Sequence, residues 1–161
     1  MLNLAPTGNA PAAADVRPRP LDIVVDGTEN ENGRALFVIS ALHLAAGALN
    51  PARIWVLAPC QPVSVAAEAL AWDAHLNVTC LPADPDFEIV KSSDLVLTAS
   101  SFEPNWPFLI VAYRAGIKAV SVVQFPRLAP ELNAHFPHIR AAHDTTVLAA
   151  RIAEELAVLR P

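Results

Sequence analysis

Residues 92–123 read SSDLVLTASSFEPNWPFLIVAYRAGIKAVSVV, and this stretch decides the fold. The pattern predicts an apolar strand over 94–99, a helix over 107–115 and a second apolar strand over 119–123. Pro107 suits the first turn of that helix and Gly116 suits its end. The first strand is followed by the polar turn Ser100–Ser101 and by Glu103. The stretch is therefore a strand–loop–helix–strand unit with Glu103 at the carboxyl end of a strand, where open α/β sheets bind their ligands.

The same alternation continues on both sides of this unit. Further strands are expected over 21–26, 53–59 and 77–82, with a short sixth strand over 138–142, and further helices over 34–49, 64–76, 86–93 and 144–159. The last helix begins with Asp144, a residue that caps helices well. Strands that are apolar throughout and alternate with helices indicate a parallel sheet covered on both faces. Residues 21–161 are thus expected to form one α/β domain, a three-layer Rossmann-like sandwich with a parallel sheet of five or six strands.

Composition limits the classes of function. Of the 161 residues, 53% are apolar and 17% charged, as in a globular chain with a large core. Eleven basic and 16 acidic residues give a net charge of −5, and no basic stripe is present to pair with nucleic-acid phosphates. No apolar run reaches the about 18 residues that a membrane span needs, and the N-terminus does not resemble a signal peptide. We therefore expect a soluble, cytoplasmic protein that binds no nucleic acid.

Cysteines and histidines carry no recognisable site in this sequence. Cys60 and Cys80 each follow an apolar run and are expected to be buried free thiols. The five histidines lack zinc-ligand spacing, so no metal is expected. The acidic loop 26–32 lacks the residue pattern of a calcium loop and is interpreted as a solvated loop before a helix. Ser100–Ser101 is not set in a nucleophile elbow, which argues against a hydrolase.

Residues 1–20 are rich in alanine and proline and have no helix or strand period. Four prolines in this segment remove backbone donors and favour an extended arm before the domain. We expect Pro18 and Pro20 to contact a partner, together with Trp106, which lies between two prolines at 104 and 107. The helices over 34–49 and 64–76 are poor in charge, and a helix without a polar stripe is either covered by another element or forms an interface. Association with other subunits or with itself is therefore expected.

From about residue 21 to 159, the sequence resembles the C-terminal, donor-nucleotide half of retaining GT-B glycosyltransferases of the glycogen-synthase and mannosyltransferase type. The matching positions are Asp94–Leu97 with Ser100–Ser101, Glu103, Ala112, Gly116, Val120–Val123 and His143–Asp144. They cover the family's acidic-aliphatic strand, its first motif glutamate, the small residues of the motif helix, the next strand and the start of the last helix. The resemblance implies a Rossmann half-domain, with Gly27, Thr28, Ser100, Ser101 and Glu103 as candidate ligand-binding residues. Glu103 is the one candidate catalytic residue that it implies.

Several residues of the family's donor site are replaced in this chain. The resemblance places Val111 where the second motif glutamate grips the ribose hydroxyls, and a valine side chain accepts no hydrogen bond. The family's arginine and lysine, which neutralise the donor diphosphate, fall near Thr28 and Asn32. The glycine-rich start of the motif helix is replaced by residues 105–107, and proline has no amide to offer a phosphate. Each replacement weakens the same nucleotide-sugar site.

Together these features favour a glycosyltransferase-like protein without donor catalysis, acting as a structural or accessory subunit in a larger assembly and needing no cofactor. The alternative is an active nucleotide-sugar-dependent subunit whose acceptor domain is a separate chain, since 161 residues have no room for a second Rossmann domain. A Rossmann-type binder of another small molecule is a further alternative.

Overall fold

The computed structural model describes residues 19–28, 34–84, 86–100, 106–123, 130, 134–135, 138–142 and 144–160. Its strands are β1 (Leu21–Asp26), β2 (Ala52–Leu57), β3 (Asn77–Leu81), β4 (Leu95–Ser100), β5 (Lys118–Val123) and β6 (Ile139–Ala142). They form one sheet in the order β3-β2-β1-β4-β5-β6, and every neighbouring pair is parallel. The expected parallel sheet is confirmed, and its strand order is that of the doubly wound Rossmann fold.

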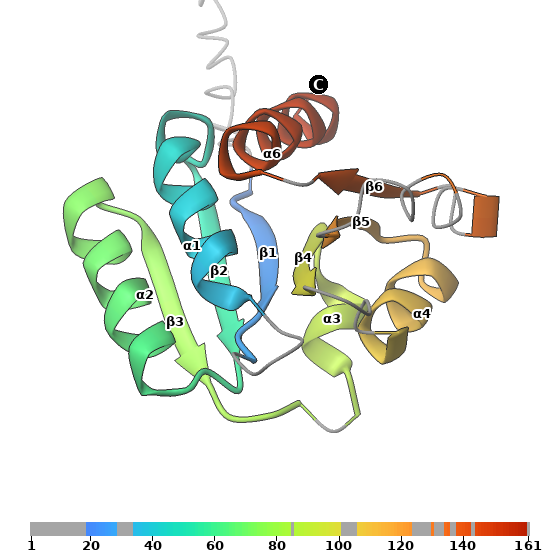
Figure 1. Ribbon diagram of the computed structural model, residues 1–161, viewed down its shortest axis with the longest axis horizontal. Helices are drawn as coiled ribbons and strands as arrows, with labels where there is room; N and C mark the ends of the chain where they lie inside the picture. The colour runs from blue at the N-terminus through green and yellow to red at the C-terminus, as the bar shows by residue number, and fades with distance from the viewer. Residues whose placement is uncertain are drawn as a thin grey trace, which may run out of the picture.

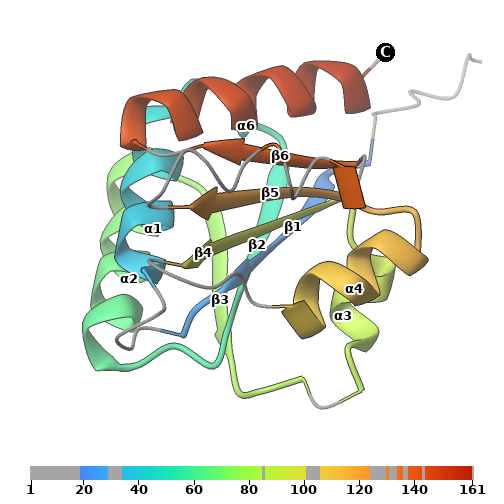
Figure 2. The same cartoon turned by 45° about the vertical axis from the view of Figure 1, so that its right-hand side comes forward.

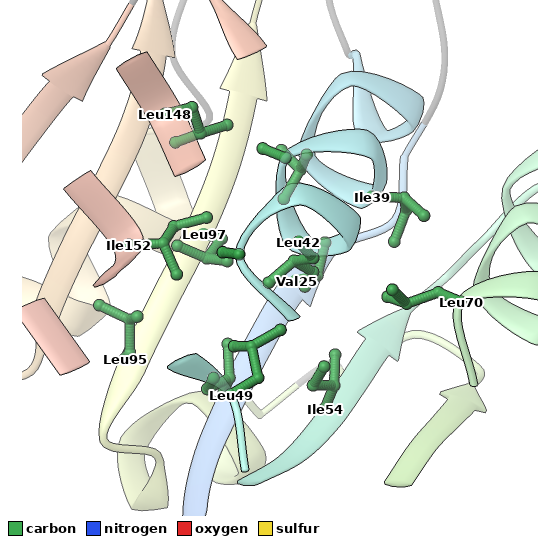
Figure 3. Close-up of a cluster of buried hydrophobic side chains, with 14 of the residues drawn as sticks. Val25, Ile39, Leu42, Leu49, Ile54, Leu70, Leu95, Leu97, Leu148 and Ile152 are labelled. Atoms are coloured by element: carbon green, nitrogen blue, oxygen red, sulfur yellow. The ribbon is translucent and has the colours of Figure 1, made fainter. Parts of the chain in front are cut away.

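Helices cover both faces of the sheet, so the three-layer arrangement is confirmed (Figures 1 and 2). On one face lie α1 (Ala35–Leu44), α2 (Gln61–Ala74) and α6 (Thr145–Leu159); on the other lie α3 (Glu88–Ser92) and α4 (Trp106–Arg114). The strand alternation of β1 matches these layers, because Ile23 and Val25 pack under the first set while Val24 packs under the second. The larger core gathers side chains of α1 and α6 over the middle strands (Figure 3).

Two helices have boundaries that differ from the sequence expectation, and the start of a third helix is as expected. The helix expected over 34–49 is divided into α1 and a short 3-10 helix at Ala46–Ala48. Helix α2 begins at Gln61, three residues before the expected start at 64, because Pro62 fits its first turn. Asp144 caps α6 as expected, and its Oδ1 accepts a hydrogen bond from the Val147 amide at 2.7 Å.

The charge-poor first helix is explained by its position. Helix α1 lies between α2 and α6 on the sheet, as Figure 1 shows, and it packs against both of them. Ala35, Val38, Ile39, Ala41 and Leu42 are buried there. Of the two explanations left open, coverage by other elements therefore accounts for most of this apolar surface. On the side of α1 that these elements do not cover, Leu44 is 64% exposed.

The two cysteines were expected to be free and buried, and the expected burial is wrong. Both thiols are free, but Cys60 is half-buried and Cys80 is exposed. Cys80 lies in β3, and β3 is an outer strand of the sheet, so its side chains have fewer neighbours than those of the middle strands. Within the described ranges, no helix is long and apolar enough to cross a membrane.

Candidate functional site

The chain changes faces between β1 and β4, and this crossing point lies in the middle of the sheet. After β1 the chain enters α1 on one face, and after β4 it enters α4 on the other. Because β1 and β4 are parallel neighbours, their carboxyl ends diverge around a crevice, the usual ligand site of such sheets. An open hollow of about 310 Å³ lies at this edge, lined by residues that include Asp26, Thr28, Leu57, Asp84, Phe87 and Phe108.

Asp26 is the buried polar group of this site. It ends β1, and only 6% of its surface is exposed. One carboxylate oxygen accepts a hydrogen bond from the Thr98 hydroxyl of β4 at 3.2 Å, and the other accepts one from the Thr28 amide at 3.2 Å. The carboxylate therefore joins the two central strands at the crossing point. It also brings negative charge to the floor of the hollow.

Gly27 is required for packing at this edge. Its amide donates to the Leu57 carbonyl at 2.8 Å, which extends the pairing of β1 with β2. A Cβ atom on this residue would lie 2.5 Å from the same carbonyl oxygen and 2.9 Å from Val56 Cγ1. Glycine is therefore the residue that lets the chain turn so close to β2. The amides of Gly27 and Thr28, two of the candidate ligand donors, both already bond within the protein.

The hollow is also lined by two aromatic rings, of which Phe87 was not recognised in the sequence. The Phe87 and Phe108 rings meet edge to face, with centroids 5.7 Å apart. Phe87 has a positive φ of 54°, and Ala58 beside it has a φ of 50°. Such conformations are uncommon outside glycine, and they cluster at functional sites. Two residues of this kind therefore lie in one hollow.

Asp84 is the second carboxylate of the hollow, and it too has a structural partner. Its Oδ2 accepts a hydrogen bond from the Ile89 amide at 2.8 Å in the first turn of α3. The N-cap position of α3 is Phe87, which has no side-chain acceptor, so Asp84 from three residues earlier takes this role. Nothing in the sequence shows, however, that this turn folds back toward Asp26. Proximity at the carboxyl edge depends on the strand order, which brings the ends of β1, β2 and β3 side by side.

The described lining of the hollow is acidic. Its described lining contains Asp26 and Asp84 and no lysine, arginine or histidine. Two phosphates would meet two carboxylates there, and like charges repel by Coulomb's law. The described residues contain no group of three metal-ligating side chains that would offset this charge. The hollow has the chemistry to accept hydroxyl or amine donors and to pack an apolar ring against Phe87 and Phe108.

The remaining predicted site residues lie in different places. Ser100 ends β4 opposite Val123 of β5, and Trp106 begins α4, so both belong to the carboxyl edge. Pro20 directly precedes β1 and lies at the amino edge, at the other end of the strand from Trp106. Pro18, Ser101 and Glu103 fall outside the described residues. The structure therefore does not bring Pro20 and Trp106 together into one surface.

A charged cluster at the amino edge was also missed in the sequence. The Asp22 carboxylate accepts hydrogen bonds from the Arg53 guanidinium, at 2.7 Å from Nε, and from Trp55 Nε1 at 3.0 Å. Partial burial disfavours its charge, but the bonds from Arg53 and Trp55 and the charges of Arg53 and Arg19 outweigh this, so the pKa of Asp22 lies below its ordinary value. Neighbouring Asp94 accepts from Arg19 and from the Asp22 amide. This cluster fastens the start of β1 to β2 and β4.

Comparison with known proteins supports the fold and leaves the activity open. No family model matches the chain, and no curated protein matches it in sequence. Among solved structures, the chain is similar to WaaG, a glycosyltransferase of lipopolysaccharide biosynthesis, with a TM-score of 0.65 and 16% identity over 88% of this chain and 39% of that one. A glycosyltransferase from Rickettsia africae gives a TM-score of 0.66 and 14% identity over 91% of this chain and 40% of that one.

The chain thus spans about two fifths of the length of these glycosyltransferases. The expected likeness to one Rossmann half of GT-B glycosyltransferases is confirmed at the level of the fold. A further similar structure is the molybdenum cofactor carrier protein of Chlamydomonas reinhardtii, with a TM-score of 0.61 and 17% identity over 86% of this chain and 99% of that one. At these identities the likenesses establish a glycosyltransferase-like Rossmann fold and nothing about catalysis.

Proposed function

We propose that this glycosyltransferase-like domain does not transfer sugar from a nucleotide donor and acts by binding, as an accessory subunit of a protein assembly. The observation that carries the proposal is the buried carboxylate of Asp26 at the crossing point of β1 and β4. At this position a donor site needs positive charge or free amides for a diphosphate. In the described part of this turn, the amides of Gly27 and Thr28 donate to Leu57 and to Asp26 itself.

The helix after β4 supports the same proposal. Helix α4 begins at Trp106 with Pro107 as its second residue. A helix N-terminus binds phosphate through its free amides, and proline has none. Val111, which stands in the middle of α4, has no polar atom for a ribose hydroxyl. Features of both the β1 turn and α4 therefore support the proposed loss of donor contacts.

Calorimetric titration of the full chain with UDP-, GDP- and ADP-sugars tests the proposal. We expect no saturable heat at ligand concentrations that saturate nucleotide-sugar enzymes. Micromolar binding of any of the three that disappears in Glu103→Ala would establish the competing function, an active subunit that takes its acceptor domain from another chain. Binding that survives Glu103→Ala but disappears in Asp26→Asn would also contradict the proposal, because it would place the donor in the hollow.

A second candidate function is a carrier for a small organic molecule. It is favoured by the likeness to the cofactor carrier protein, which this chain matches over 99% of that protein's length. It is also favoured by the hollow with two carboxylates and two phenylalanine rings. Native mass spectrometry of the purified chain tests it, since a carrier is expected to show a discrete mass excess that denaturation removes. Phe108→Ala should release that mass, and an unchanged excess would exclude the hollow as the binding site.

A further inference from the structure

One outer edge of the sheet carries a surface that the proposed function does not use. Strand β3, Asn77–Leu81, is the outermost strand beside β2, so one side of its backbone faces away from the sheet. Its sequence, NVTCL, contains no charge and no proline. Natural sheets protect their outer strands with charged side chains, prolines or covering elements. β3 has neither charged side chains nor prolines.

The opposite outer strand shows the protection that β3 lacks. β6 is one residue shorter than β3 and carries Arg140, which is exposed and pairs with Glu155 of α6 at 3.1 Å. A charged side chain on an outer strand disfavours pairing with another strand. The two edges of this sheet therefore differ in the feature that controls edge-to-edge association.

Helix α2 adds an apolar projection and a hollow next to β3. Trp72 is 82% exposed, the largest exposed apolar side chain among the described residues. Beside it lies a groove of about 470 Å³ between α2 and β3, and its floor is formed by Ala67, Ala71, Val78 and Cys80. Small residues on the helix leave this groove open. An exposed tryptophan beside such a groove is typical of a binding anchor and a binding pocket.

We infer that this surface, formed by β3 and the outer side of α2, binds a second copy of the same chain. A two-fold axis perpendicular to the sheet would set the two β3 strands antiparallel and continue the sheet across both molecules. The same axis sets the two α2 helices antiparallel on one face. Each Trp72 then comes opposite the groove of the other copy, which is the isologous arrangement of most soluble dimers.

Hydrogen-bonding complementarity favours a second copy as the partner. The groove contains one charged side chain, Glu68, one helical turn before Trp72 on the same side of α2. An indole N–H is a donor and a carboxylate is an acceptor. In the antiparallel arrangement the donor of each Trp72 faces the Glu68 acceptor of the other copy, twice by symmetry. The uncharged β3 strands meet without repulsion, although the whole chain carries a net charge of −5.

A second copy bound at β3 and α2 would be a partner for the proposed binding function, and only this link rests on that function. The self-association is tested separately. Sedimentation velocity of the full chain over a dilution series is expected to show a reversible monomer–dimer equilibrium. Trp72→Glu should weaken the dimer at least about 30-fold, the loss expected for a hot-spot tryptophan. The matched control is Val158→Glu, a change at a residue 67% exposed on α6, which should leave the equilibrium unchanged. Circular dichroism of each variant verifies that the fold is retained.

Cross-linking at the native Cys80 adds a geometric readout. In the Cys60→Ser background, a short bismaleimide should join two chains through Cys80, because any centred antiparallel β3 pairing brings these residues close. Trp72→Glu should remove the cross-link.

Each other outcome overturns the inference. A monomer at all concentrations removes the second copy, and nucleotide-sugar titrations that stay negative would then leave the proposed lack of catalysis intact. A dimer that withstands Trp72→Glu places the interface elsewhere. A dimer that withstands this change but is lost when residues 1–18 are deleted would assign the contact to the N-terminal arm.

Discussion

Gly27 and Gly47 form a matched pair of positions, because they differ in how closely other atoms pack around them. Both residues have ordinary φ values, so neither is needed for left-handed backbone. At Gly27 an added Cβ would overlap the Leu57 carbonyl oxygen, a backbone atom that moves only with β2, whereas nothing lies within 4 Å of a Cβ at Gly47. A glycine is therefore needed at position 27 first for the stability of the fold, and only second for ligand binding.

We expect Gly27→Ala to lower the free energy of unfolding by about 1–3 kcal/mol, as overpacking of a tight site does. Gly47→Ala should raise it slightly, by about 0.5 kcal/mol, because alanine restricts the unfolded chain. Urea denaturation of both variants against the parent measures the difference. Equal stabilities of the two variants would contradict the close approach of Gly27 to β2.

Asp22 makes stability depend on acid pH. Because the pKa of Asp22 in the folded state lies below its ordinary value, the folded state binds this proton less readily than the unfolded state. Its contribution is fully present above about pH 4 and is lost as the pH falls through the folded-state pKa. Asp22→Asn should therefore destabilise the protein at neutral pH by about 1–3 kcal/mol, the value of hydrogen bonds to a charged group.

Urea unfolding of the parent and Asp22→Asn between neutral pH and pH about 2.5 provides the measurement, and the gap between them should shrink across the acid range. Arg151→Gln is the control. Arg151 pairs with Glu154 on the exposed side of α6, and exposed pairs of this kind contribute little. If the difference in free energy of unfolding between the two proteins stays constant with pH, Arg53 and Trp55 do not stabilise the charge of Asp22.

At the scale of elements, α6 returns the chain from β6 to the face where it packs on α1. Its start depends on one cap, the Asp144 carboxylate on the Val147 amide. Glu155 in its third turn is buried and lies near Lys118 of β5 and Arg140 of β6. The distance from Glu155 Oε2 to Lys118 Nζ is 3.2 Å, but the directions do not make a hydrogen bond, so Arg140 is the better-defined partner.

Asp144→Ala should lower the free energy of unfolding by about 1 kcal/mol, because one amide of the first turn loses its acceptor. Thr146→Ala is the matched control, since Thr146 lies exposed in the same first turn and the cap bond does not involve it. Thermal and urea unfolding should rank the two variants in that order. Equal effects would indicate that the first turn of α6 is held by packing alone.

The elements themselves could be predicted from the sequence to a large extent. Continuous apolar strands and the Pro107 and Gly116 boundaries indicated the parallel sheet and α4, because such signals are local. The carboxyl-edge hollow could not be predicted in the same way. Asp84 and Phe87 follow β3, while Asp26 ends β1, and only the register of β1, β2 and β3 brings them together. For the same reason the apolar character of α2 was visible, but the outward direction of Trp72 was not.

For the whole molecule, the division into an arm and a domain stays a prediction. Among the described residues, the six strands and both core clusters lie between Leu21 and Leu159. A variant that begins at Arg19 should therefore unfold in one cooperative transition with the same midpoint as the full chain, since Arg19 keeps its contact with Asp94. Chemical denaturation of the two chains tests this. A lower midpoint for the shortened chain would mean that residues 1–18 stabilise the domain.

The central place of β1 has a consequence for how the chain folds during synthesis. β1 precedes the other described strands in the chain, yet one of its two neighbours, β4, follows about 70 residues later, as the pairing of Val25 with Leu97 shows. Until β4 leaves the ribosome, the edge of β1 that will pair with β4 has unpaired backbone groups. Contacts so distant in sequence form slowly, and open strand edges attract other chains in the meantime. We therefore expect the nascent chain to need chaperone protection until residue 100 has been released.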